Sequence, residues 1–218
     1  MKHVTLRTSV AAALAAAALT GAAGAAEILV STDIATTTTW TKNNTYNLQA
    51  QIYVLPGATL TIEPGTVIAS TTNLGGSLAV TRDARIVAVG TANEPIIFTS
   101  KADVATWVGG NPQTGTWRAS ANEWGNLTIC GRGYIGKYGT GAISTNTAAP
   151  NASNVAVMEG LTQSSSADTR PLYGGGNDND YSGVLKYCSF RYGGKVIGLG
   201  NELNGISLGG VGRETQIS

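Results

Sequence analysis

Residues 54–68 read VLPGATLTIEPGTVI, and this stretch decides the fold of the chain. It contains two short segments in which apolar and polar residues alternate, and the pair Pro56-Gly57 precedes the first as Pro64-Gly65 precedes the second. Alternation is typical of β-strands, and Pro-Gly pairs are typical of turns. The same order of strands and corners returns between residues 76 and 98. Such near-regular spacing predicts a chain wound into a solenoid.

The apolar strands that follow predict about five coils of this solenoid. Each apolar stripe is too small to form a core alone, but stacked coils bury a continuous column of side chains. The residues expected to fill this column are Leu60, Ile62, Val67, Ile86, Val87, Ile97, Leu127, Ile129, Phe190, Ile206 and Leu208. Ile86 and Val87 are neighbours in one strand, so they cannot both point inward.

The first 26 residues have the pattern of an export signal. Lys2 and Arg7 give a positive start, residues 10–19 are apolar and mostly alanine, and small residues continue to Ala26. A membrane anchor is the alternative, but the apolar part is shorter than the roughly 20 residues that a spanning helix needs. We therefore expect residues 1–26 to be a signal peptide, and the mature chain to begin near Glu27 with no later membrane span.

Charge and composition favour one all-β domain over residues 27–218. Without Lys2 and Arg7, 12 basic residues remain against 13 acidic ones, so no strong attraction for nucleic acid is expected. Charged residues make up only 12% of the chain, whereas glycine accounts for 29 residues. This composition suits β structure with many turns.

Three segments flank or interrupt the coils. Residues 27–51 are expected to cap the first open edge, with Trp40 and Tyr46 lying over it. Two long polar segments, residues 101–123 and 137–180, are expected to leave the solenoid at corners. They are either variable surface loops or the segments that build a binding face.

The end of the chain shows no cap. Residues 201–218 begin a coil like the earlier ones and then stop. A solenoid needs a polar terminal repeat, and a bare strand edge pairs readily with other chains. We therefore expect a truncated copy of a longer protein with further coils, or a last edge that another chain covers.

Several of these segments resemble a known group of proteins. Residues 40–48 (WTKNNTYNL) and 60–68 (LTIEPGTVI) are similar to the opening of exported bacterial right-handed parallel β-helix proteins, and residues 95–100 (PIIFTS) and 124–129 (WGNLTI) are similar to their later coils. The resemblance implies a pectin-lyase-like solenoid, although it does not imply lyase chemistry. It also implies a location outside the bacterial cytoplasm: extracellular, at the cell surface or in the periplasm.

Few residues could carry catalysis. His3 is the only histidine and lies in the expected signal peptide, so the mature chain has no Ser-His-Asp triad, Cys-His pair or histidine metal site. We assign no catalytic residue. The alternative is a polysaccharide lyase or glycoside hydrolase on the same fold. Convergence of three or more Asp, Glu, Lys and Arg side chains on one outer face of adjacent coils would favour it.

Residues 174–180 (GGGNDND) form an oxygen-rich loop. Asp178, Asp180 and Ser182 are weak candidates for Ca²⁺, which takes six to eight oxygen ligands, but Ser189 stands where an EF-hand loop has its bidentate glutamate. The other interpretation is a turn into the next strand, because Asn and Asp favour turns by local hydrogen bonding. No other cofactor is expected.

The two cysteines, Cys130 and Cys188, need not form a disulfide. An exported chain could form one. Alternation, however, places Cys130 on the outside of its strand and Cys188 on the inside, together with Phe190. Opposite faces argue against pairing, and the sequence leaves the question open.

Aromatic residues in the polar insertions are the clearest functional signal. These residues are Trp107, Trp117, Tyr134, Tyr138 and Tyr173. Flat apolar rings flanked by amides suit sugar binding, so we expect an extracellular polysaccharide as ligand, although the rings could instead pin their own loops. A carbohydrate-binding module would need Trp107 and Trp117 exposed on one side. The sequence thus predicts a non-enzymatic, exported scaffold of the surface or adhesion type.

Overall fold

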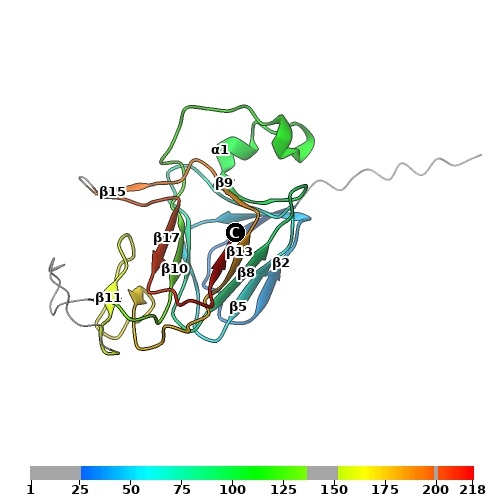
Figure 1. Cartoon of the computed structure of the whole chain (residues 1–218). Coiled ribbons are helices and arrows are strands. Elements are labelled where there is room, and N and C mark those ends of the chain that lie inside the picture. The colour runs from blue at the N-terminus through cyan, green and yellow to red at the C-terminus, as the bar shows by residue number, and fades with distance from the viewer. Residues whose placement is uncertain (1–25, 137–151, 199–200) are drawn as a thin grey trace, which may run out of the picture.

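The protein is a parallel β-helix with three sheets, as seen in a computed structural model that describes residues 26–136, 152–198 and 201–218 (Figure 1). Sheet A contains β1 (Ala26–Val30), β3 (Asn44–Leu48), β6 (Val67–Ser70), β9 (Ile96–Ser100) and β14 (Cys188–Phe190). Sheet B contains β4 (Gln51–Val54), β7 (Ser77–Val80), β10 (Leu127–Cys130) and β17 (Ile206–Gly209). Sheet C contains β2 (Thr38–Trp40), β5 (Thr59–Ile62), β8 (Arg85–Val89), β13 (Gly183–Lys186) and β18 (Gln216–Ile217).

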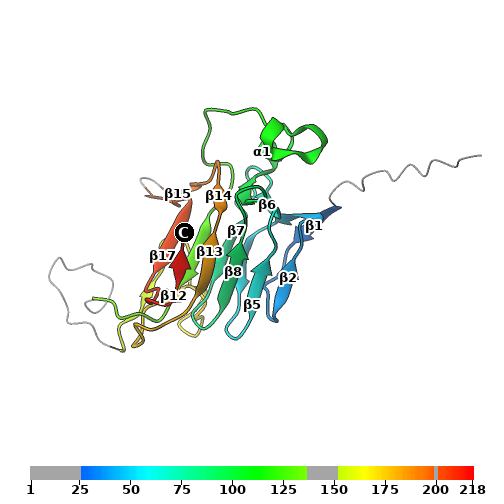
Figure 2. The ribbon, with the colours of Figure 1, turned by 45° about the vertical axis from the view of Figure 1, so that its right-hand side comes forward.

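The chain visits the sheets in the repeating order C, A, B. Strands β2, β3 and β4 form the first coil, and β5–β7, β8–β10 and the set β13, β14, β17 form the next ones. Every neighbouring pair within these sheets is parallel and continuous in register. Figure 2 shows β2, β5, β8 and β13 side by side along the solenoid. The expectation of an all-β parallel solenoid is confirmed.

The two Pro-Gly pairs make the corners on either side of β5. The amide of Ala58 donates to the carbonyl of Leu55 over 3.0 Å, and that of Thr66 donates to the carbonyl of Glu63 over 3.2 Å. Gly57 and Gly65 have φ of +86° and +77°. A type II turn has proline at its second position and needs a positive φ at its third, which glycine adopts without strain.

The core is one column of inward-facing side chains. Tyr46, Ile68, Phe98 and Phe190 occupy successive strands of sheet A at matching register positions. Phe98 stacks on Phe190 with ring centroids 4.9 Å apart, and the ring of Trp124 also stacks against Phe98, at 6.4 Å. The predicted core residues Leu60, Ile62, Ile86, Leu127 and Ile129 are all buried in this column.

Three predicted core residues face outward instead. Val67 and Ile97 lie on the outside of sheet A, one position before the inward-facing Ile68 and Phe98. Val87 is half-buried on the outside of sheet C, and its neighbour Ile86 points inward. The prediction was wrong for Val67 and Ile97 because an insertion covers this face. Both sides of the strand are therefore apolar, and alternation alone cannot identify the inner one.

Long connections leave the solenoid between sheets. Residues 101–126 connect β9 to β10 and contain α1 (Lys101–Val104) and two short 3-10 helices (Val108–Gly110 and Pro112–Thr114). Residues 131–182 connect β10 to β13. A third connection, residues 191–205, was not predicted and contains the antiparallel pair β15 (Val196–Gly198) and β16 (Asn201–Glu202).

The connection 131–182 covers the outer face of sheet B. Its antiparallel strands are β11 (Ala156–Val157) and β12 (Leu172–Tyr173), visible in yellow in Figure 1. A second apolar cluster joins Met158, Leu161 and Tyr173 of the connection to Tyr53, Ala79 and Cys130 of the sheet. Arg170 also pairs with Asp33 over 3.0 Å, so this late connection is linked to the first residues of the fold.

The N-terminal segment extends the sheets. Strands β1, β2 and β3 all fall within residues 26–51, and Trp40 and Tyr46 are buried there with their rings stacked 4.5 Å apart. At the other end, Leu208 and Ile217 in the last strands are 44% and 52% exposed. The predicted core position Leu208 is therefore only half covered, since few neighbours pack over this coil.

Candidate functional site

Two hollows lie side by side where residues 101–123 cover the outside of sheet A. The first has a volume of about 580 Å³ and is bounded by Trp117, Arg118, Phe190 and Tyr192; we call it the Trp117 hollow. The second has a volume of about 420 Å³ and lies between the sheet and the insertion, with Trp107 in its wall; we call it the Trp107 groove. Pro112 and Arg191 line both hollows.

The insertion begins with a capped helical turn that places Asp103 and Trp107. The Ser100 hydroxyl accepts a hydrogen bond from the amide of Asp103 over 3.1 Å, as an N-cap residue does. Four residues after Asp103, the indole Nε1 of Trp107 donates to its Oδ1 over 3.3 Å. Trp107 is only 8% exposed. A carbohydrate-binding module would need an exposed Trp107, but this ring pins its own loop, which is the other interpretation that the sequence left open.

Trp117 is the exposed aromatic residue of the insertion. Its side chain is 79% exposed at the rim of the Trp117 hollow. The ring of Tyr192 lies below the guanidinium of Arg118, with 4.7 Å between the guanidinium carbon and the ring centroid. Tyr192 has φ of +56°, an uncommon value for a residue with a side chain. The hollow therefore offers a flat indole, a cation and further aromatic rings.

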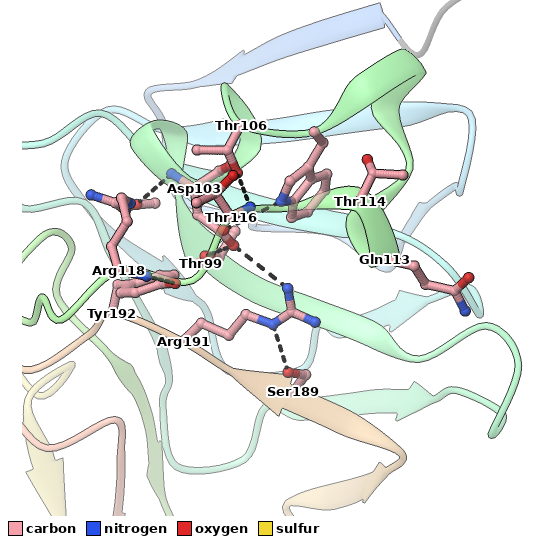
Figure 3. A network of polar contacts seen from close by, with 12 residues as sticks. Thr99, Asp103, Thr106, Gln113, Thr114, Thr116, Arg118, Ser189, Arg191 and Tyr192 are labelled. Carbon is pink, nitrogen blue, oxygen red and sulfur yellow. Dashed lines mark hydrogen bonds and ion pairs between the residues drawn. The ribbon is translucent and has the colours of Figure 1, made fainter.

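A network of polar contacts that includes Asp103, Arg118 and Arg191 lies at the hollow (Figure 3). Arg118 donates two hydrogen bonds to the Glu123 carboxylate, over 2.6 and 2.7 Å, and the Ser100 hydroxyl donates a third. These contacts, led by the one with Arg118, lower the pKa of Glu123 to about 2 although burial opposes the shift. Asp103 accepts from the Thr99 hydroxyl over 2.8 Å and lies 3.7 Å from Arg191.

Four charged side chains, Asp103, Arg118, Glu123 and Arg191, thus converge on one outer face, which is the arrangement that would favour the enzymatic alternative. Their carboxylates, however, already have partners. Glu123 is bound by Arg118 and Ser100, and Asp103 by Thr99 and Trp107. A carboxyl group whose pKa is about 2 is ionised near neutral pH, so it holds no proton to donate as a general acid and is only a weak base. The arrangement fits a structural support better than an acid-base pair.

The remaining aromatic candidates lie elsewhere. Tyr134 is exposed in the connection 131–182, where its backbone amide donates to Asp178 over 2.9 Å. Tyr173 is half-buried in the apolar cluster over sheet B. Tyr138 lies outside the described residues. The structure does not bring Tyr134 or Tyr173 to the Trp117 hollow.

Arg118, Arg191 and Tyr192 belong to the site and were not predicted as binding residues. The signal that could have identified them is their position in the sequence, next to Trp117 or next to the end of a strand. Arg118 directly follows Trp117, and the pair Arg191-Tyr192 follows strand β14 as it leaves sheet A. Because β9 and β14 are neighbours in sheet A, the segments that follow them emerge at the same corner.

The calcium candidates have local hydrogen-bond partners. Asp180 accepts from the Ser182 hydroxyl over 2.8 Å, and Asp178 accepts from the amide of Tyr134. Asn177 accepts from the amide of Asn179 over 3.1 Å, which is an Asx turn. Within the described ranges, no three His, Cys, Asp or Glu side chains are grouped as a metal site would require.

Both cysteines are free thiols. Cys130 is buried on the outer side of sheet B beneath the connection, whereas Cys188 packs against the inner column. Burial raises the pKa of Cys130 to about 12 and that of Cys188 to about 11. Neither thiol is therefore ionised near neutral pH, and opposite faces separate them, as the alternation predicted.

Comparison with known proteins identifies the class. The family model for the pectate-lyase like beta helix domain matches residues 32–218, so the chain belongs to that family. No curated protein and no solved structure matches it. None of the helices in the described part of the chain is long and apolar enough to cross a membrane.

Proposed function

We propose that this chain is an exported bacterial scaffold, of the surface or adhesion type, that binds an extracellular polysaccharide at the Trp117 hollow. The β-helix supplies a rigid spine, and the connections between sheets supply the binding surface. The export signal is supported by residues 1–26 of the sequence alone.

The exposed indole of Trp117 carries this proposal. A tryptophan that is 79% exposed costs hydration free energy unless a partner covers it. The ring stands beside a hollow of about 580 Å³, which is large enough for one or two sugar rings. Arg118 and Ser120 at the same hollow can donate hydrogen bonds to hydroxyl groups.

A glycan array with the purified whole chain tests the proposal. We expect Trp117→Ala to reduce retention on the bound polysaccharide about fivefold or more, because one stacked aromatic ring contributes of order 1 kcal/mol or more. Val108→Ala is the matched control, since Val108 is exposed on the same insertion but away from the hollow. Unchanged retention by Trp117→Ala would move the binding surface elsewhere.

The enzymatic alternative has less support. A lyase or glycosidase needs carboxylates free to exchange protons. Those gathered at the Trp117 hollow serve as partners for Arg118, Thr99 and Trp107. The described side chains therefore favour binding over catalysis.

A further inference from the structure

The Trp107 groove, which adjoins the Trp117 hollow, has an apolar floor. Val67 and Ile97, from neighbouring strands β6 and β9, form this floor, and Trp107 with Pro112 forms the opposite wall. The space of about 420 Å³ between sheet and insertion is within the size range of small-molecule sites. Its two facing apolar walls suit a flat body of about one ring.

One end of the groove carries an incompletely paired cation. The Nε of Arg191 donates to the Ser189 hydroxyl over 3.1 Å, and its Nη1 lies 3.7 Å from Asp103. That separation exceeds a hydrogen bond, and the same Asp103 oxygen already accepts from Thr99. Within the described ranges no hydrogen bond engages the terminal guanidinium nitrogens. They can therefore donate to a ligand.

The charges around the groove favour an anion. Its lining contains Arg191 and Lys42 as cations, and Glu94, which pairs with Lys42 over 3.1 Å, as the only carboxylate among the described lining residues. The net charge of the lining is thus positive. Gln113 also lines the groove, and its carboxamide makes no hydrogen bond within the described ranges.

We propose that the Trp107 groove binds a small organic carboxylate with a flat apolar body. The carboxylate pairs with the Arg191 guanidinium, whose planar donors match two carboxylate oxygens. The apolar body lies between the Val67–Ile97 floor and the wall at Trp107. The groove shares Arg191 and Pro112 with the Trp117 hollow, but its apolar floor and the Trp107 wall belong to the groove alone, and carboxylate binding does not require polysaccharide in the hollow.

Isothermal titration calorimetry of the whole chain tests the proposal, with benzoate, cyclohexanecarboxylate and indole-3-carboxylate as probes. We expect at least one carboxylate to bind, and its uncharged amide to bind about tenfold more weakly or worse, because the charge-assisted pair is lost. Arg191→Gln should weaken binding by a similar factor. Arg213→Gln, at an exposed arginine on another connection, should not.

A second variant tests the location without removing a charge. Val67→Phe fills the groove from its floor, and Val87→Phe makes the same change on the outside of sheet C. The first should lose about tenfold or more in affinity and the second should bind like the wild type.

The proposal is overturned if acid and amide bind equally, if Val67→Phe binds normally, or if none of the three carboxylates binds at millimolar concentration. Trp117→Ala should leave carboxylate binding unchanged, which separates this site from the proposed polysaccharide site.

Discussion

At the residue scale, Glu123 connects the insertion to the solenoid through its charge. Its pKa of about 2 in the fold lies below its ordinary value of 4.5, so ionised Glu123 stabilises the folded state. This contribution is present in full above pH 4.5 and is lost as the pH falls toward about 2. We expect melting temperatures to fall across this window, and to fall less steeply in Glu123→Gln.

Two features make this pH test specific. Asp168 and Asp83 also have lowered pKa values because of Arg170 and Arg132, so part of the acid sensitivity should remain in Glu123→Gln. Glu94→Gln, which removes an exposed partner of Lys42, should follow the wild-type curve closely. A Glu123→Gln curve that superimposes on the wild type would contradict the assigned role.

The strand register can be tested with a pair of neighbouring substitutions. Ile62 points into the core, whereas Thr61 lies half-buried on the outside of sheet C. Ile62→Asp should prevent folding, since an unpaired buried charge costs several kcal/mol. Thr61→Asp should yield soluble protein with a protease resistance near that of the wild type. Folded, protease-resistant Ile62→Asp would disprove the register.

At the scale of elements, substitution of the two tryptophans in the insertion should affect stability and binding differently. Trp107→Ala removes a buried ring and a hydrogen bond to Asp103, and we expect it to lower the free energy of unfolding by about 3 kcal/mol. Trp117→Ala should change it by less than about 0.5 kcal/mol. Urea denaturation measures both values. Equal losses would mean that Trp117 also serves the fold.

The same elements show what the sequence could reveal. Pro-Gly turns and alternation predicted β5 and its corners, because each signal is local. Val67 and Ile97 can be apolar on the outer side of sheet A because the insertion covers them. That insertion follows β9 and gives no signal in the sequence of β6 itself. Trp107 and Trp117 stand in similar polar surroundings in the sequence. Only the helical turn that places Asp103 next to Trp107 distinguishes the buried ring from the exposed one.

The candidate site was therefore predicted only in part. Trp117 was identified from its residue type and its neighbours. Arg191 and Tyr192 follow β14 and meet Trp117 because β9 and β14 pair across the 87 intervening residues 101–187, which include both insertions. Pairing over such a distance is set by the stacking of coils and has no local signal.

At the scale of the whole molecule, the last strands should promote association. Ile217 in β18 and Leu208 in β17 are about half exposed, and each strand has one unpaired edge among the described residues. We propose that another chain pairs with this edge, as strand edges tend to pair. Light scattering should show concentration-dependent association of the whole chain, which Ile217→Lys reduces and the distant Leu74→Lys does not. A monomer at all concentrations would contradict this proposal.

The pairing of Arg170 with Asp33 has a mechanical consequence. A solenoid pulled at one end can unwind one coil at a time, because each coil holds only its neighbours. Here Arg170 lies in the connection that follows the third coil, and it forms an ion pair with Asp33, which precedes the first coil. Its guanidinium also lies over the ring of Tyr53 in β4. A load applied at the N-terminal end must therefore break this link before β4 can peel away. The Arg170–Asp33 pair thus cross-links non-adjacent parts of the solenoid, so that the early coils resist tension together.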